Sequence, residues 1–219
     1  LSKPYEMIDM VTTPDGSLVA MVHCNNCTSD LNAWVNLFKE YQELLGIPVD
    51  MDELYGKLYN IALTGDTDCG GLLSYNYISG EPVTGLAEGR PLFVRSANDK
   101  FNLANFMRAH LYASVGVLKI GNDILFNEEK IKVDRITGHG GLFRTKGVGQ
   151  RVLAAAINSP ISVMETAGEG GAWGIALLGS YLVINKKGQS LADFLDESVF
   201  VSDAGVEVSP TPEDVAGFN

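Results

Sequence analysis

The chain has 219 residues, of which 46% are hydrophobic and 9% aromatic, enough to fill the core of one large globular domain or two small ones. Its 16 basic and 27 acidic residues give a formal net charge of -11, and no basic cluster interleaved with aromatics interrupts this background, which argues against nucleic-acid binding. The longest apolar run, residues 171–184, contains glycines and is shorter than the ~20 residues that a membrane span needs, so we expect no membrane segment.

The first residues of the chain and its cysteines bear on whether it is part of a longer polypeptide and on its redox compartment. It starts Leu1-Ser2-Lys3-Pro4, with neither an initiator methionine nor a signal region, and we expect it to be a piece of a longer polypeptide. Its three cysteines are an odd number in a chain too large to depend on disulfides, which indicates a reducing cytoplasm. Cys24 and Cys27 have the C-x-x-C spacing of redox and zinc sites. Because no second pair follows, we expect unpaired thiols and assign no metal site.

The first third of the sequence predicts a hairpin followed by helices. Two β-branched runs, residues 7–13 and 17–23, flank a Pro-Asp-Gly turn. After Thr28 and Ser29, which can cap a helix, apolar residues recur at helical spacing as far as Leu45. A shorter helical pattern follows, with its apolar positions at Leu54, Leu58 and Ile61.

The middle of the sequence predicts a strand at residues 72–77, a long loop at 79–100 and a long helix from Asn102 to about Gly121. His110 lies on a face of that helix and is expected to be a core or interface residue. Earlier in the chain, Asp66 and Asp68 stand in turn-rich sequence and are assigned turn chemistry rather than a metal or acid–base site. Single arginines at 90, 95 and 108 are interpreted as surface ion pairs.

The last part predicts alternating β and α elements, which is typical of a layered α/β domain. The expected elements are a strand at 132–137, a glycine turn at 138–141, a helix at 145–156, a strand at 161–163 and a small-residue helix at 170–183. A hairpin around residues 203–205 is expected in the remaining segment.

The strand, glycine turn and helix at residues 132–156 suit a nucleotide. Glycine allows the backbone to approach a ligand, and a helix start presents N–H groups and the positive end of a dipole. However, the phosphate-loop motif is absent, and Phe143 stands where the dinucleotide fingerprint needs its third glycine. A plain turn between strand and helix therefore remains an equal alternative. The glycines at 168–174 are expected to serve helix packing.

Taken together, several segments resemble in order and spacing the C-terminal lobe of FGGY carbohydrate kinases. They are Ile136-Thr-Gly-His-Gly-Gly141, Gln150, Pro160-Ile-Ser-Val-Met164, Glu169-Gly-Gly-Ala-Trp-Gly-Ile-Ala-Leu-Leu178, and upstream residues 70–73, 80–81 and 106–109.

The resemblance implies an α/β fold, an actin-like ATPase (ribonuclease H-like) lobe with a mixed sheet flanked by helices. Such a lobe holds ATP, with Mg²⁺, in a cleft against a second lobe. Residues 1–185 would form the C-terminal nucleotide-binding lobe and residues 186–219 an extension of it. The implied function is the nucleotide-binding part of an ATP-dependent kinase that phosphorylates a ketopentose-type sugar such as xylulose.

The resemblance also implies nucleotide-binding positions and no catalytic residue or metal ligand in this chain. Gly140, Gly141 and Leu142 would lie along the adenine and ribose, Thr145 at the base, Ser29, Asp30 and Ala33 toward the phosphates and ribose, with Arg144 added by position only. The larger side chains of residues 142–145 replace the small ones common in the family at these positions.

The family's glycine-rich phosphate motif and catalytic aspartate are not in this sequence, so we expect the chain alone to bind ATP or ADP without transferring phosphate. The sugar would be held mainly by the missing N-terminal lobe, and the apolar surface that this lobe covers favours a homodimer. One alternative is a non-catalytic actin-like lobe that binds a partner protein or regulates an intact kinase. Another is an unrelated α/β domain without nucleotide affinity.

Overall fold

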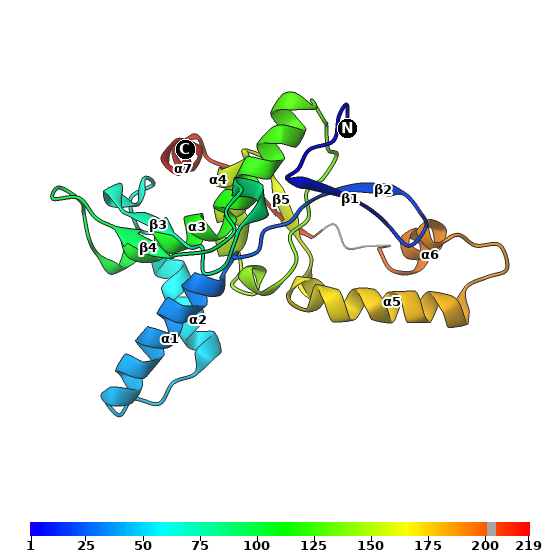
Figure 1. The fold of residues 1–219 in the computed structure, drawn as a ribbon. Helices are drawn as coiled ribbons and strands as arrows, with labels where there is room; N and C mark the ends of the chain where they lie inside the picture. The colour runs from blue at the N-terminus through cyan, green and yellow to red at the C-terminus, as the bar shows by residue number, and fades with distance from the viewer. Residues whose placement is uncertain (201–204) are drawn as a thin grey trace.

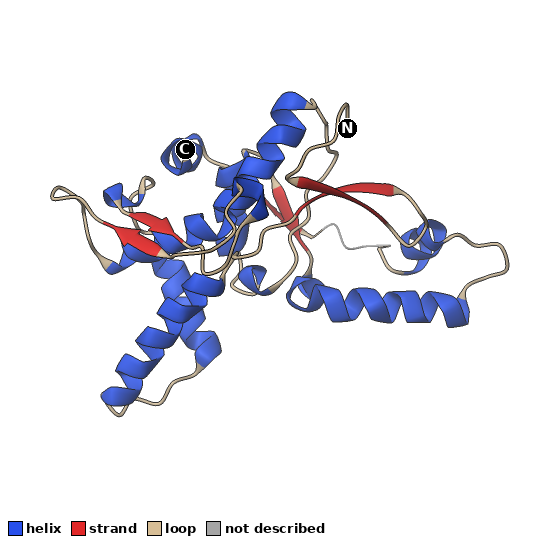
Figure 2. Cartoon of the chain, in the orientation of Figure 1, coloured by secondary structure: helices blue, strands red, loops and turns tan. Residues whose placement is uncertain are grey.

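The computed structural model describes residues 1–200 and 205–219 and combines helices with three short pairs of strands (Figure 2). Each pair is antiparallel, and among the described residues the pairs do not join into one continuous sheet. The pairs are β1 (Ile8–Thr12) with β2 (Leu18–Val22), β3 (Leu73–Tyr75) with β4 (Leu92–Val94), and β5 (Ile161–Val163) with β6 (Val206–Val208).

The predicted N-terminal hairpin is confirmed. Ile8 lies opposite Val22 and Thr12 opposite Leu18. The Asp15 carboxylate closes the turn by accepting a hydrogen bond of 3.0 Å from the Ser17 N–H. This side-chain bond to a nearby backbone group is the reason that Asp is favoured in such turns.

Two helices, α1 (Ser29–Leu44) and α2 (Met51–Ala62), form a pair that projects from the body of the molecule (Figure 1). Both are confirmed predictions. The Asp50 carboxylate caps α2 by accepting from the Glu53 N–H at 3.0 Å. On α2 the buried side is made by Leu54, Leu58, Tyr59 and Ala62, whereas Ile61, which we expected on that side, is 37% exposed.

Helix α3 (Leu103–Asp123) is the central element of the core, and it begins where the sequence predicts because the Asn102 side chain accepts from the Asn105 N–H at 2.9 Å. It packs against α2 and against α4 (Val148–Ile157). Met107 and Leu111 of α3 are fully buried between them. His110 is 1% exposed, which confirms its expected place in the core.

Two expectations near the glycine turn were wrong. Residues 132–137 are mostly exposed and form no strand, because their pairing is confined to one parallel bridge between Thr137 and Ser162 of β5. A strand needs a neighbour over several residues to satisfy its backbone groups. Helix α4 begins at Val148 rather than at Thr145, because Gly147 has φ 79° and a left-handed residue ends a right-handed helix.

The long loop at 79–100 contains β4, which the sequence did not predict, since β4 is only three residues long and depends on β3. The expected hairpin around residues 203–205 falls largely outside the described residues. Single helical turns complete the fold at Cys69–Gly71, Pro82–Thr84, Ile124–Glu128, Gly141–Phe143 and Glu165–Glu169.

Three helices lie in the described part of the C-terminal region. Helix α5 (Gly170–Ile184) extends away from the body with α6 (Leu191–Ser198) near its far end (Figure 1). Helix α6 has a capping box between Ser190 and Asp193. Helix α7 (Pro212–Phe218) returns to the body and contacts α4, and its Phe218 ring lies 4.7 Å from the Tyr112 ring of α3.

A buried group of charges holds α7 in place. The Asp214 carboxylate is 1% exposed and contacts the guanidinium of Arg108, which is 2% exposed. It also accepts from Arg151 Nε at 2.6 Å. Asp214 therefore ties α3 to α4, and Arg108, expected in a surface ion pair, is instead buried. The Arg108 guanidinium also donates to the Tyr112 hydroxyl at 3.0 Å.

Replacing Asp214 with Asn should lower the free energy of unfolding by about 3 to 5 kcal/mol, because it leaves a buried guanidinium without its counter-charge. Urea titration followed by circular dichroism measures this change. The control is Lys57→Gln, which breaks an exposed pair with Glu53 and should cost at most about 1 kcal/mol. Equal losses in the two variants would contradict this role for Asp214.

Candidate functional site

A cavity of about 620 Å³ lies where the glycine turn before α4 faces the α1–α2 pair. Segments far apart in the sequence thus share one hollow. Its lining comes from the start of α1, from one side of α2 and from the glycine turn: Thr28, Asn32, Met51, Asp52, Tyr55, Tyr59, Gly141, Leu142, Arg144 and Thr145.

The glycine turn has a backbone that is fixed on one side and open on the other. Gly140 has φ 106°, a conformation that favours glycine, and its N–H donates to the Ala167 carbonyl at 2.7 Å. Gly141 follows at the cavity wall, and a Cβ added there would meet no atom within 4 Å. The turn therefore offers a ligand close access to the backbone at Gly141.

The start of α1 forms a second wall of the cavity. Thr28 precedes the first residue of the helix, and Asn32 lies one turn further along. The positive end of the α1 dipole therefore lies beside the cavity, where it favours an anionic group. The dipole is relevant to anion binding because the protein as a whole has a net charge of -11, which repels anions.

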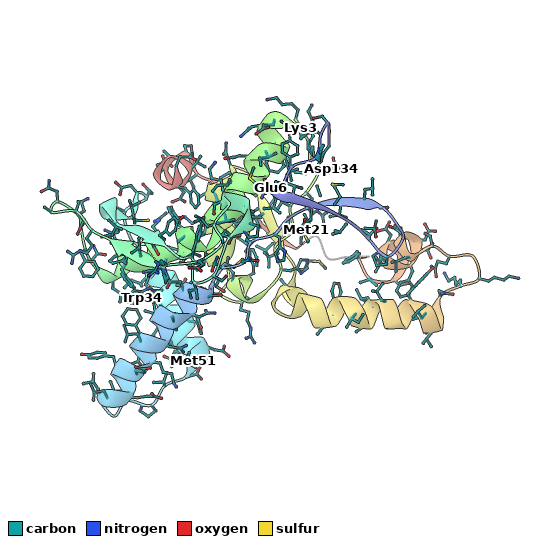
Figure 3. The ribbon with its side chains drawn as sticks, in the orientation of Figure 1. Lys3, Glu6, Met21, Trp34, Met51 and Asp134 are labelled. Atoms are coloured by element: carbon teal, nitrogen blue, oxygen red, sulfur yellow. The ribbon has the colours of Figure 1, made fainter. Side chains whose placement is uncertain are left out.

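Helix α2 forms the third wall, which the sequence analysis missed. Tyr55 and Tyr59 stand one helical turn apart, with ring centroids 5.6 Å apart and planes nearly perpendicular. The Tyr55 hydroxyl donates to Asn32 Oδ1 at 3.0 Å and so joins α2 to α1. Met51, labelled in Figure 3, begins this helix. The four-residue spacing of the two tyrosines is the signal in the sequence for this wall, and the aliphatic core pattern of α2 does not reveal it.

Four of the eight residues predicted to bind nucleotide line this cavity, namely Gly141, Leu142, Arg144 and Thr145. The other four lie next to it in the sequence without lining it. Ser29 and Ala33 are exposed at the start of α1, and Gly140 precedes the lining part of the turn. Asp30 is different, because its side chain turns into the core.

Asp30 is 8% exposed and pairs with a buried histidine. Its Oδ2 lies 3.4 Å from His110 Nδ1, which is also 2.9 Å from the Ser74 hydroxyl. Burial raises the pKa of Asp30, opposed by a hydrogen bond from Trp34. Asp30 therefore anchors the start of α1 to α3 instead of facing the cavity.

His110 is enclosed by aromatic rings. Its ring stacks on Phe93 at 5.5 Å and lies 4.4 Å from Phe106 and 5.2 Å from Trp34, whose place on α1 Figure 3 labels. This burial lowers the pKa of His110 to about 4. The histidine is thus neutral at physiological pH and serves the packing of α1 against α3.

Within residues 1–200 and 205–219 no group of three or more His, Cys, Asp or Glu side chains is arranged to hold a metal ion. Asp68, as expected, has a turn role, since its carboxylate accepts from the Gly70 N–H at 2.9 Å. Asp66 instead pairs with Lys100 at 3.0 Å. A search of the described helices found none long and apolar enough to cross a membrane.

Comparison with known protein families shows to which family the chain belongs. Residues 1–183 match the FGGY family of carbohydrate kinases, C-terminal domain. The chain belongs to the FGGY family of carbohydrate kinases. No curated protein gave a significant match to its sequence.

Solved structures of FGGY kinases resemble the chain in fold. Xylulose kinase from Rhodospirillum rubrum matches with a TM-score of 0.57 and 19% identity, over 87% of this chain and 35% of that chain. Gluconate kinase from Lactobacillus acidophilus matches with 0.54 and 20%, over 74% and 31%. Glycerol kinase with ADP from Plasmodium falciparum matches with 0.54 and 19%, over 83% and 34%.

These likenesses confirm the expected fold class, the actin-like ATPase fold of FGGY C-terminal lobes. At such identities they establish the fold alone. The chain spans about a third of the length of each of these kinases.

The buried His110 should make the stability of this FGGY lobe depend on pH. Its folded pKa is about 4, below the ~6.5 of an unfolded histidine, so the unfolded chain binds more protons between these values. The free energy of unfolding should therefore fall as pH drops from about 6.5 to 4, by on the order of 3 kcal/mol, less the opposing effect of Asp30 with its raised pKa.

Urea titrations over this pH range measure the effect. The His110→Asn variant should lose most of the slope, whereas His23→Asn, at an exposed histidine, should retain it. An unchanged slope in His110→Asn would show that other groups cause the pH dependence.

Proposed function

We propose that this chain binds ATP and ADP in the cavity between α1, α2 and the glycine turn, as the nucleotide-binding lobe of an ATP-dependent sugar kinase. One observation supports the proposal most: the accessible backbone at Gly141 and the positive end of the α1 dipole line the same cavity. Such a pair suits a ligand with a flat base and an anionic end. One of the structures similar to this chain is a glycerol kinase with ADP, which supports the proposal.

The polar and charged ends of the cavity suggest how the nucleotide lies. Gly141 and Leu142 would follow the ribose and one face of the adenine, with Thr145 at the base. Thr28 and Asn32 would face the phosphates at the start of α1, where the dipole favours negative charge. Arg144, on the rim, would add a positive charge. Gly140, Ser29, Asp30 and Ala33 would then act through the backbone and through the position of α1.

The ring of Tyr55 on α2 would complete the base site, with the buried Tyr59 packed behind it. Tyr59 is 3% exposed and fixed by packing, and Tyr55 is held by its bond to Asn32, so both are rigid before a ligand arrives. Aromatic side chains supply a large apolar contact surface for a planar base. Base affinity is therefore expected to depend on α2 as well as on the glycine turn.

Mg²⁺ would enter with the nucleotide. In phosphoryl transfer it bridges the phosphates and is commonly held through them with few protein ligands. Asp52 is the one carboxylate among the side chains that line the cavity, and it would orient water on such an ion. The remaining ligands would come from the part of the kinase outside this sequence.

The sugar and the catalytic base would also come from outside this sequence, so this chain alone would not transfer phosphate. A ketopentose such as xylulose is our proposed acceptor, because xylulose kinases are among the similar structures. Gluconate and glycerol kinases resemble the chain as well, and sugar specificity belongs to the other lobe in this proposal.

Replacing Gly141 with Arg should weaken Mg-ADP binding by about tenfold or more, because the long side chain enters the cavity where no Cβ now stands. Isothermal titration calorimetry on the purified chain measures the affinity. The matched control is Gly179→Arg on α5, an exposed glycine whose added Cβ also meets no atom within 4 Å.

Saturable binding that is lost in Gly141→Arg and kept in Gly179→Arg is the predicted outcome. Equal affinity in both variants would place the nucleotide elsewhere. Absence of binding by the folded wild-type chain would contradict the proposal that this lobe binds nucleotide by itself, and it would favour the non-catalytic, partner-binding alternative.

Self-association is a second proposal for this chain, supported by the exposed apolar surface of α5. Leu182 and Val183 are 78% and 82% exposed, and Ile175 is 68% exposed. Surfaces of this kind mark contacts with another protein surface. Light scattering should detect a homodimer, and a Leu182→Lys, Val183→Glu double variant should shift it toward the monomer. A wild-type chain that stays monomeric at high concentration would contradict the prediction.

A further inference from the structure

The turn that leads into α1 carries two cysteines that the proposed function does not use. Cys24 and Cys27 are separated by two asparagines, at which the chain bends sharply. Cys27 is exposed and Cys24 is half-buried, and neither is in a disulfide. Helix α1 begins two residues after Cys27.

Buried polar side chains hold this turn in shape. Asn26 is 1% exposed and its Oδ1 accepts from the N–H groups of Ile78 and Ser79, both at 2.9 Å. The fully buried Glu81 accepts from Asn25 N–H and from Asn26 Nδ2, both at 3.0 Å. The two residues between the cysteines are thus fixed from the neighbouring loop, so the distance between the cysteines is set by the fold.

The Cys27 side chain reaches back across this turn to the backbone of Cys24. The Cys27 thiol lies 3.4 Å from the Cys24 carbonyl oxygen. A hydrogen bond from the Cys24 thiol lowers the pKa of Cys27 to about 7, against the opposing effects of burial and of Glu81. The same hydrogen bond, with burial, raises the pKa of Cys24. Cys27 is therefore both the more exposed and the more acidic thiol of the pair, the one that more readily supplies a thiolate.

We propose that Cys24 and Cys27 are a redox-active dithiol that forms a reversible intramolecular disulfide by exchange with small-molecule disulfides, of which oxidised glutathione is the test case. This inference stands apart from nucleotide binding. Its grounds are the C-x-x-C spacing, the fixed turn, the contact of the Cys27 thiol with the Cys24 carbonyl oxygen and the unequal exposure of the two thiols.

The exchange takes two steps. Cys27 thiolate attacks one sulfur of the glutathione disulfide, which forms a Cys27–glutathione bond and releases one glutathione thiolate. Cys24, after its proton passes to water, attacks Cys27 Sγ, which forms the Cys24–Cys27 bond and releases the second thiolate. The two protein thiols lose two electrons, the glutathione disulfide gains them, and two protons end on the two glutathione thiols.

The experiment incubates the whole chain in glutathione buffers of increasing oxidising strength, blocks free thiols with an alkylating reagent, and analyses tryptic peptides by mass spectrometry. Both cysteines fall in one peptide, because no Lys or Arg lies between Lys3 and Lys39. In oxidising buffer this peptide should escape alkylation and lose about 2 Da, the mass of two hydrogens, and it should recover fully in reducing buffer.

Variants test the order of the steps. Cys24→Ser should retain a glutathione adduct on Cys27, because the resolving thiol is missing, and Cys27→Ser should acquire little adduct. Cys69 is the internal control, since it is 4% exposed and burial raises its pKa to about 12, so it should remain reduced. A pair that stays reduced in every buffer, an adduct confined to Cys27→Ser, or disulfide-linked dimers on a non-reducing gel in place of the intramolecular bond would each overturn the proposal.

Discussion

The packing of α3 between α2 and α4 is the constraint on which the site depends. One wall of the cavity is carried by α1 and α2, and the opposite wall by the turn that precedes α4, so α3 sets the distance between them. Two buried polar groups keep α3 in register with its neighbours. His110 contacts Asp30 at the start of α1, and Arg108 meets the Asp214 carboxylate that also binds Arg151 of α4. The glycine turn and the α1 start are thus positioned by contacts outside the cavity.

The charge of the chain and its proposed ligand are compatible for a local reason. A protein of net charge -11 repels a nucleotide at long range, but the start of α1 and the glycine backbone at the cavity favour an anionic group locally, and the Arg144 charge there offsets that of Asp52. The orientation of the Asp30 side chain also affects the charge near the proposed phosphate position. Its carboxylate points into the core beside His110 and so leaves the phosphate side of α1 without a negative group from this residue.

Local patterns predicted the elements that depend on local physics. The hairpin at residues 8–22, the amphipathic α1 and the capped α3 follow from turn chemistry and periodicity, and the structure has all three. The strand at 132–137 failed because a strand needs a partner that its own sequence does not specify. The Asp214 cluster, the role of Tyr55 and Tyr59 and the inward turn of Asp30 escaped prediction, since each joins residues far apart in the chain. Four of the residues that line the cavity were named through family resemblance rather than periodicity, and their role in binding stays a prediction.

Hydrogen–deuterium exchange with and without saturating Mg-ADP tests the central claim most directly, because it reports binding and location together. The account predicts slower exchange in three segments that are separate in the sequence, namely residues 28–34, 51–59 and 141–145, with no change in α5 and α6. Protection confined to the hollow on the other side of the glycine turn, beside Met164, Trp173 and β6, would contradict it. Exchange unaffected by Mg-ADP throughout the chain would contradict it equally.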